Sequence, residues 1–145
     1  MSKRRVVVTG LGIVSPVGIG AAEAWKNLLA GVSGVGPITR FDAAQLPTRI
    51  AAEVRGFKSA DWMPLKETRR SDLFIHYGIA ATRLALDDAG FKIDDSNAER
   101  VGVNMGSGIG GLPMIEDNIR EMIAKGPRRI SPFFEIGRAS CRERV

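Results

Sequence analysis

An α/β fold is predicted by the order of the sequence patterns along the chain. Residues 101–115 run from a short apolar stretch through a glycine cluster into a helix-like pattern. Residues 4–29 show a similar order, with a β-branched run, a turn that holds Gly10, Gly12, Gly18 and Gly20, and then an amphipathic stripe. Strand, glycine turn and helix in this order are typical of α/β enzymes, where the backbone must approach a ligand or another element closely.

Composition narrows the class of protein. The 145 residues are 44% hydrophobic and 26% charged, which are values of a globular protein without long disorder. The net charge of +5 is not gathered in one run, and the two Trp, one Tyr and six Phe do not alternate with basic residues. We therefore expect no nucleic-acid partner.

Cysteine usage and the N-terminus bear on location. A single cysteine, Cys141, excludes an intramolecular disulfide and indicates a reducing compartment. The basic start followed by an uncharged run imitates a signal peptide, but Pro16 and several glycines interrupt that run. No stretch approaches the roughly 20 apolar residues of a membrane helix. We expect a cytoplasmic protein with no membrane partner.

In the first part of the chain, residues 4–9 predict a buried strand. Apolar residues at helical spacing predict a helix over 21–29 with a buried stripe, and Gly31 is placed to end it. Residues 32–48 have the composition of a loop. Alternation over 50–54, with Ile50 and Ala52 on one side, predicts a strand with one face less buried.

The middle of the chain predicts two helices. Pro64 suits the start of a short helix, on which Lys66, Arg69 and Arg70 share one face. Ser71 can cap a second helix that runs to about Ala89 and is closed by Gly90. This helix is apolar on nearly every side, which is typical of a helix inside a larger protein. Small residues in it allow close approach by neighbours: Gly78, Ala80 and Ala81.

The only histidine, His76, lies on that apolar helix. We interpret it as a core or interface histidine with satisfied hydrogen bonds rather than as a catalytic group. Further on, Pro113 can open a helix that Gly126 and Pro127 end. Its expected buried stripe consists of Ile115, Ile119, Met122 and Ile123.

The glycine cluster satisfies the pattern of a dinucleotide-binding turn. Gly106, Gly108 and Gly111 have the spacing of that motif, which would cradle a phosphate at a helix N-terminus. A Rossmann-type oxidoreductase is therefore one hypothesis. Neither glycine turn is followed, about 20 residues on, by the acidic residue at the end of a second strand that such a site uses.

Four stretches carry a more specific resemblance. They are MSKRRVVVTGLGIVSPVG at 1–18, KETRRSD at 66–72, GSGIGGL at 106–112 and GPRRISPFF at 126–134. Together they resemble the N-terminal part of the β-ketoacyl-acyl-carrier-protein synthases, most closely the type II condensing enzymes of bacterial fatty acid biosynthesis. The resemblance covers residues 1–134. It implies the N-terminal portion of a thiolase-like layered αβαβα fold, incomplete in this chain, from an enzyme that forms a homodimer.

The resemblance also implies an activity. These enzymes are acyltransferases that elongate an acyl chain by decarboxylating Claisen condensation with malonyl-carrier protein, without a cofactor or a metal. Their partner is the acyl carrier protein. A polyketide ketosynthase or a non-catalytic chain-length factor shares the fold and stays open as an alternative parent.

The family's nucleophilic cysteine and two histidines lie beyond the matched region. Cys141, in Ala-Ser-Cys-Arg-Glu, comes too soon after Phe134 and in the wrong context. We therefore expect no catalytic residue in this chain and no activity from the chain alone. Residues 135–145 lose both the resemblance and any periodicity, so we expect them to be a tail unrelated to the family, from a frame change, a sequence-assembly junction or an adapter-derived extension.

Two sets of site residues follow from the family motifs. Lys66, Arg69 and Arg70 match the basic surface that receives the acidic carrier protein, where complementary potential would steer binding. Gly108, Ile109 and Phe134 match positions beside the acyl channel, with Phe134 reaching it from the partner subunit.

Overall fold

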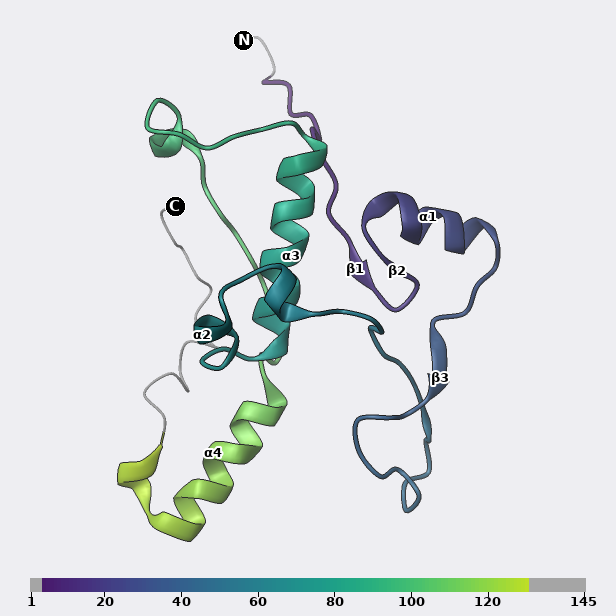
Figure 1. The fold of residues 1–145 in the computed structure, drawn as a ribbon, viewed down its shortest axis with the longest axis vertical. Helices are drawn as coiled ribbons and strands as arrows, with labels where there is room; N and C mark the ends of the chain where they lie inside the picture. The colour runs from purple at the N-terminus through teal and green to yellow at the C-terminus, as the bar shows by residue number, and fades with distance from the viewer. Residues whose placement is uncertain (1–3, 131–145) are drawn as a thin grey trace. The chain divides into compact units, whose positions relative to one another are not determined.

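The computed structural model describes residues 4–130 and contains both helices and short strands, as expected for an α/β chain (Figure 1). It divides into two compact units. The first unit comprises residues 1–58 with 80–91, and the second comprises residues 59–79 with 92–145. Helix α3 (Leu73–Asp88) contributes its first half to the second unit and its second half to the first.

The first unit opens with a tight hairpin that leads into a helix. Strands β1 (Val14–Ser15) and β2 (Gly18–Ile19) pair antiparallel, and helix α1 (Ala21–Leu29) follows at once. The Glu23 carboxylate, in the first turn of α1, accepts a hydrogen bond from the backbone N–H of Ile19 at 2.9 Å. An acidic side chain that reaches back in this way satisfies a free backbone donor at the helix start.

Glycines end α1 and α3 as predicted. Gly31 has φ +68° and Gly90 has φ +59°, a conformation that glycine adopts without strain. After α1, the Gly31 amide bonds the Leu28 carbonyl and the Val32 amide bonds the Asn27 carbonyl. The same pair of bonds follows α3. Both helices therefore close with a Schellman motif.

A second hairpin lies in the first unit. Strand β3 (Val35–Pro37) pairs antiparallel with strand β4 (Ile50–Ala52), so the predicted strand near residue 50 is confirmed. Part of the predicted loop at 32–48 is a strand, because pairing with β4 supplies partners that the sequence of residues 32–48 alone does not reveal. The two faces of β4 also differ in burial, with Ala51 half-buried and Ile50 and Ala52 exposed.

The predicted buried strand at 4–9 is wrong for the described structure. Residues 4–9 carry no strand assignment, and Val6 is 93% exposed. A strand needs a neighbouring strand for its backbone N–H and C=O groups, and none pairs with this run within residues 4–130. Residues 4–9 have the composition of a strand, but no strand within residues 4–130 pairs with them.

The glycines that follow this run contact α3. A Cβ added at Gly10 would overlap the backbone of Ala85, and one added at Gly12 would overlap the carbonyl of Ala81. The Leu11 amide between them donates to the Asp88 carboxylate at 2.9 Å. The glycines of this turn thus let the chain lie directly on the small-residue face of α3, which confirms the expected close approach.

The second unit is mainly helical. A 3₁₀ turn, η1 (Ser59–Asp61), and the short helix α2 (Leu65–Thr68) precede α3. A 3₁₀ turn, η2 (Ala98–Arg100), then leads through an extended stretch to helix α4 (Leu112–Lys125), which ends at Gly126 before a last 3₁₀ turn, η3 (Pro127–Arg129). The helix after Pro113 is confirmed. The strand expected near residues 101–105 is not formed, again because no strand pairs with it within residues 4–130.

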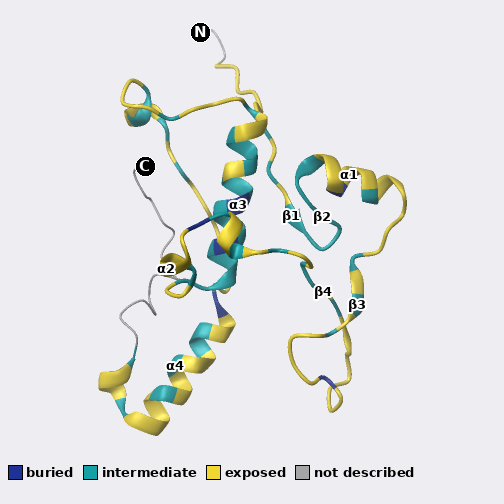
Figure 2. Ribbon diagram, in the orientation of Figure 1, coloured by how far each residue is buried: buried dark blue, intermediate teal, exposed yellow. Residues whose placement is uncertain are grey.

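The buried core is small (Figure 2). The buried residues of the described chain are Ala24, Ala43, Met63, His76, Ala80 and Gly111. The expected buried stripes of α1 and α4 are instead largely open to solvent, with Trp25 62% and Ile123 78% exposed. The apolar spacing predicts the helices correctly, but burial needs a facing layer, and these two faces have none in the described residues. Among those residues, no helix is both long enough and apolar enough to cross a membrane.

Candidate functional site

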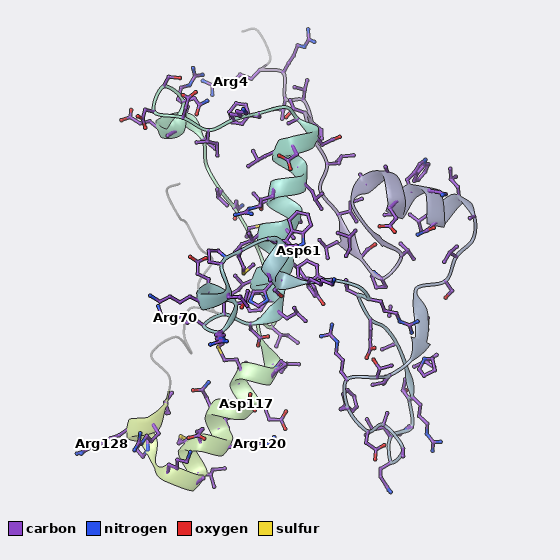
Figure 3. The ribbon with its side chains drawn as sticks, viewed as in Figure 1. Arg4, Asp61, Arg70, Asp117, Arg120 and Arg128 are labelled. Carbon is purple, nitrogen blue, oxygen red and sulfur yellow. The ribbon has the colours of Figure 1, made fainter. Side chains whose placement is uncertain are left out.

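The predicted carrier-protein residues lie together on the surface of the second unit. We call residues 64–70 the basic segment. Pro64 precedes α2, and the helix amides of Glu67 and Thr68 bond its carbonyl. Lys66, Arg69 and Arg70 are all exposed, and Figure 3 labels Arg70 beside α2. Lys66 lies on α2 and Arg69 and Arg70 directly follow it, so three exposed cations lie within five consecutive residues.

His76, on α3, contacts Ser71, the residue that follows this segment. Its ring is 5% exposed, and both ring nitrogens have serine partners. Nδ1 lies 2.9 Å from the Ser59 hydroxyl and Nε2 lies 3.0 Å from the Ser71 hydroxyl. The interpretation of His76 as a satisfied core histidine is confirmed.

The expected helix cap at Ser71 is wrong. The Ser71 hydroxyl donates to the Glu67 carbonyl at 2.9 Å, at the end of α2, and contacts His76. Asp72 takes the capping role instead, because its Oδ1 accepts from the Leu73 amide at 2.6 Å. Serine and aspartate are both good caps, so the choice between neighbours depends on what each side chain can reach in the folded chain.

The glycine cluster leads into α4. Within it, the Ser107 hydroxyl accepts a hydrogen bond from the Gly110 amide at 3.0 Å, and Gly110 has φ +83°. Gly108 is exposed with open space where a Cβ would stand, and Ile109 is 67% exposed. The structure thus places Gly108 and Ile109 at the exposed tip of this turn. Phe134 and Cys141 lie outside the described residues.

Asp72 also reaches the start of α4. Its Oδ2 accepts a hydrogen bond from the Met114 amide at 3.1 Å, and a Cβ added at Gly111 would overlap its carboxylate. A dinucleotide phosphate would need this same helix N-terminus. The anion position is therefore filled by a side chain of the protein, and Gly111 serves close packing against Asp72. This contact removes the structural basis for a phosphate site at the glycine cluster.

Other features of the described chain lie away from the predicted site residues. An open hollow of about 320 Å³ in the first unit is bordered by polar side chains that include Ser15, Glu23, Asn27 and Arg55. Among residues 4–130, no group of three or more histidine, cysteine or acidic side chains is placed to hold a metal ion. The hollow contains none of the residues expected to bind the carrier protein or the acyl chain.

Comparison with known proteins identifies the family. The family model for the β-ketoacyl synthase N-terminal domain matches residues 3–141. This chain belongs to the β-ketoacyl synthase family. The match continues past residue 134 into the stretch expected to be unrelated, and the origin of residues 135–145 stays a prediction.

A curated member of this family is similar over nearly the whole chain. The 3-oxoacyl-[acyl-carrier-protein] synthase 2 of Coxiella burnetii is 54% identical over 137 residues, which are 94% of this chain and 33% of the relative. The chain thus spans about a third of the length of the curated relatives it matches.

Solved ketosynthases share the fold. A β-ketoacyl synthase from Burkholderia phymatum matches with a TM-score of 0.74 at 33% identity, over 93% of this chain and 34% of that chain. The ishigamide ketosynthase/chain length factor matches with a TM-score of 0.72 at 32% identity, over 92% of this chain and 33% of that chain. The expectation of a partial thiolase-like α/β fold is confirmed.

Two residues important to the arrangement of this ketosynthase segment were not predicted as such. Asp72 joins the starts of α3 and α4, and His76 joins residues on both sides of the basic segment. Met114, one of the two hydrogen-bond partners of Asp72, lies 42 positions away along the sequence, so no local sequence pattern indicates this contact. The only signal in the sequence was that His76 is a polar residue in the apolar first half of α3.

Proposed function

We propose that this chain is the N-terminal part of a 3-oxoacyl-[acyl-carrier-protein] synthase 2. Such an enzyme elongates acyl chains in fatty acid biosynthesis by condensing an enzyme-bound acyl group with malonyl-carrier protein, with loss of carbon dioxide. The observation that supports this function best is the 54% identity to the Coxiella burnetii enzyme over 94% of this chain.

The role of this segment within the enzyme is to receive substrates rather than to perform the chemistry. Covalent condensation requires a cysteine nucleophile with histidines that stabilise developing charge. By the family resemblance, those groups belong to the part of the enzyme that follows. Inactivity of the chain by itself, assembly of the enzyme as a homodimer and its cytoplasmic location belong to this proposal.

The basic segment is the proposed contact for the carrier protein. Three exposed cations on and beside α2 give a positive surface suited to an acidic partner helix. Exposure alone would suit any solvated surface, so the family motif KETRRSD supplies the specific support. Gly108 and Ile109, at the tip of the glycine turn, are the proposed border of the acyl channel, together with Phe134.

A hybrid enzyme tests the function. Residues 1–134 of this chain would replace the matched segment of the Coxiella burnetii synthase 2, to give what we call the hybrid synthase. Condensation of acyl- and malonyl-carrier protein is expected at a rate similar to that of the parent. A soluble, dimeric hybrid without condensing activity would contradict the proposal.

Charge reversal tests the docking surface in the same hybrid. Arg69→Glu with Arg70→Glu should raise KM for malonyl-carrier protein about tenfold or more, because each arginine–carboxylate attraction becomes a repulsion. The matched control reverses Arg4 and Arg5, an exposed adjacent pair in the first unit, and should leave KM unchanged. Equal KM values for the two double variants would exclude the basic segment as the docking surface.

A polyketide parent is the second candidate. It is favoured by the similarity to the ishigamide ketosynthase/chain length factor, which covers 92% of this chain at 32% identity. The residue at the nucleophile position in the continuing reading frame discriminates. Another residue there supports a chain-length factor, whereas a cysteine excludes it and leaves a condensing enzyme of either pathway.

A further inference from the structure

The sole histidine of the chain connects the two ends of a folded stretch that carries the basic segment. Ser59 starts η1, and Ser71 directly follows the basic segment. His76 lies between their side chains, with Nδ1 at 2.9 Å from one hydroxyl and Nε2 at 3.0 Å from the other. The His76 ring thus contacts both the first and the last residue of the stretch 59–71.

The hydrogen positions in this chain of contacts follow from the geometry. The Ser71 hydroxyl donates its one hydrogen to the Glu67 carbonyl at 2.9 Å, so towards His76 it can only accept. Nε2 therefore carries the ring hydrogen, and in the neutral ring Nδ1 accepts from the Ser59 hydroxyl. The result is a directed series of hydrogen bonds from Ser59 through His76 and Ser71 to the Glu67 carbonyl.

Both ends of this series are anchored in backbone structure. The Ser59 carbonyl accepts from the amides of Trp62 and Met63, and Met63 is itself 5% exposed. The Glu67 carbonyl also accepts from the Arg70 amide at 3.0 Å. The last member of the series is thus bonded to the backbone of one of the docking arginines.

The basic segment needs such support. Helix α2 spans only Leu65–Thr68, and a single helical turn is unstable in water because nucleation costs more than one turn returns. The order of the segment must come from contacts with the body of the unit, and the buried His76 holds a residue on each side of the segment, Ser59 before it and Ser71 after it.

We propose that His76 is a positioning residue for carrier-protein binding: through Ser59 and Ser71 it holds the basic segment so that Lys66, Arg69 and Arg70 face an acidic partner together. This role rests on the proposed docking function of the basic segment. His76 contacts neither substrate nor reacting atoms. Its effect is to lower the ordering cost of binding, because a surface already ordered loses less freedom on association.

Two substitutions in the hybrid synthase separate positioning from general structure. His76→Leu keeps an apolar side chain in the site but removes both hydrogen bonds. His76→Gln supplies one carbonyl acceptor and one amide donor, which can serve Ser59 and Ser71 in the same directions. We expect the leucine variant to raise KM for malonyl-carrier protein about tenfold with little change in kcat, and the glutamine variant to restore it.

A small substrate provides the discriminating readout. The malonyl thioester of N-acetylcysteamine lacks the carrier protein and cannot use the basic segment. Its KM and kcat should be unchanged by His76→Leu. An equal loss with both substrates would show a general structural defect and overturn the proposal, and so would an unchanged KM for the carrier-bound substrate.

Two further variants keep the test decisive. Ser59→Ala removes a single bond of the series and should raise the carrier-bound KM by a smaller factor, which covers the case in which the leucine variant fails to fold. Charge reversal at Arg69 and Arg70 reports on the docking function itself. If charge reversal raises KM for malonyl-carrier protein and the His76 and Ser59 variants do not, only the positioning role is wrong. If charge reversal has no effect on this KM, the docking function and the positioning role are both wrong.

Discussion

The Asp72 carboxylate accepts a hydrogen bond from the Met114 amide at 3.1 Å, while its other oxygen accepts from the Leu73 amide at 2.6 Å. One side chain therefore serves the first turns of both α3 and α4. Helix N-termini carry free backbone donors and partial positive charge, and a carboxylate satisfies both. Because Asp72 lies two residues after the basic segment and packs on Gly111, it links the chain next to the proposed docking surface to the glycine turn within the second unit.

Replacing Asp72 by asparagine should lower the free energy of unfolding by about 1 kcal/mol, the usual net contribution of one hydrogen bond. Asparagine has one acceptor oxygen where Asp72 uses two, so either the Leu73 or the Met114 amide loses its partner. The unfolding temperature of the hybrid synthase measures the effect. Asp88→Asn is the matched control, since Asp88 serves the Leu11 amide with one oxygen, and asparagine can keep that bond. A shift at Asp88 as large as at Asp72 would contradict the double role.

Two glycines of the same cluster should differ sharply in their tolerance of alanine. A Cβ at Gly111 would overlap the Asp72 carboxylate, whereas a Cβ at Gly108 would enter open space. We expect Gly111→Ala to destabilise the fold by about 1–3 kcal/mol, as overpacking usually does. Gly108→Ala should be close to neutral for stability. Thermal unfolding of both variants measures this, and equal stability would show that Asp72 does not pack against Gly111.

The size of the residue at position 109 should affect which acyl chains are accepted. If Ile109 borders the acyl channel, Ile109→Phe in the hybrid synthase shortens the longest product, because each CH₂ that can no longer be buried loses about 0.8 kcal/mol. Product lengths after multiple rounds of elongation give the answer. Ile119→Phe on α4 is the control for added aromatic volume. Identical product distributions for the wild-type and Ile109→Phe enzymes would remove Ile109 from the channel.

In acid, protonation of Glu53 should weaken the contact between Thr39, which lies beyond β3, and Glu53, which directly follows β4. The hydroxyl and the amide of Thr39 donate to the Glu53 carboxylate at 2.6 and 3.0 Å and hold the pKa of that carboxyl below its ordinary value of 4.5. Because the pKa is lowered in the fold, the stabilisation is present above the unfolded pKa and is lost as pH falls through the folded pKa.

Thr39→Val tests this pair by removing the hydroxyl, the largest contribution. The pKa of Glu53, followed by NMR titration of its carboxyl carbon, should rise toward the ordinary value. Asp94 serves as the internal reference, because Ser96 lowers its pKa independently of Thr39. An unchanged pKa of Glu53 would show that the Thr39 hydroxyl does not bond it in solution.

The sequence by itself determined the features that depend on near neighbours. The helices at 21–29, 73–88 and 112–125 form where the spacing of apolar residues predicts them, and their ends lie at or next to the predicted glycines. Helical hydrogen bonds join residues four apart, so the information for them is local. The family was also indicated by sequence alone, because four motifs in the right order are far more specific than any single glycine pattern.

Only the tertiary structure decided which segments pair as strands, which helix faces are buried and which residue caps α3. Residues 4–9 and 101–105 have the composition of strands, but a strand depends on partners distant in sequence, and the described chain pairs neither. Trp25 and Ile123 lie on predicted buried stripes yet remain exposed, since burial requires a facing layer. Asp72 rather than Ser71 caps α3 because Ser71 is held by Glu67 and His76. These outcomes depend on contacts across long separations, which hydrophobic periodicity and capping preference do not encode.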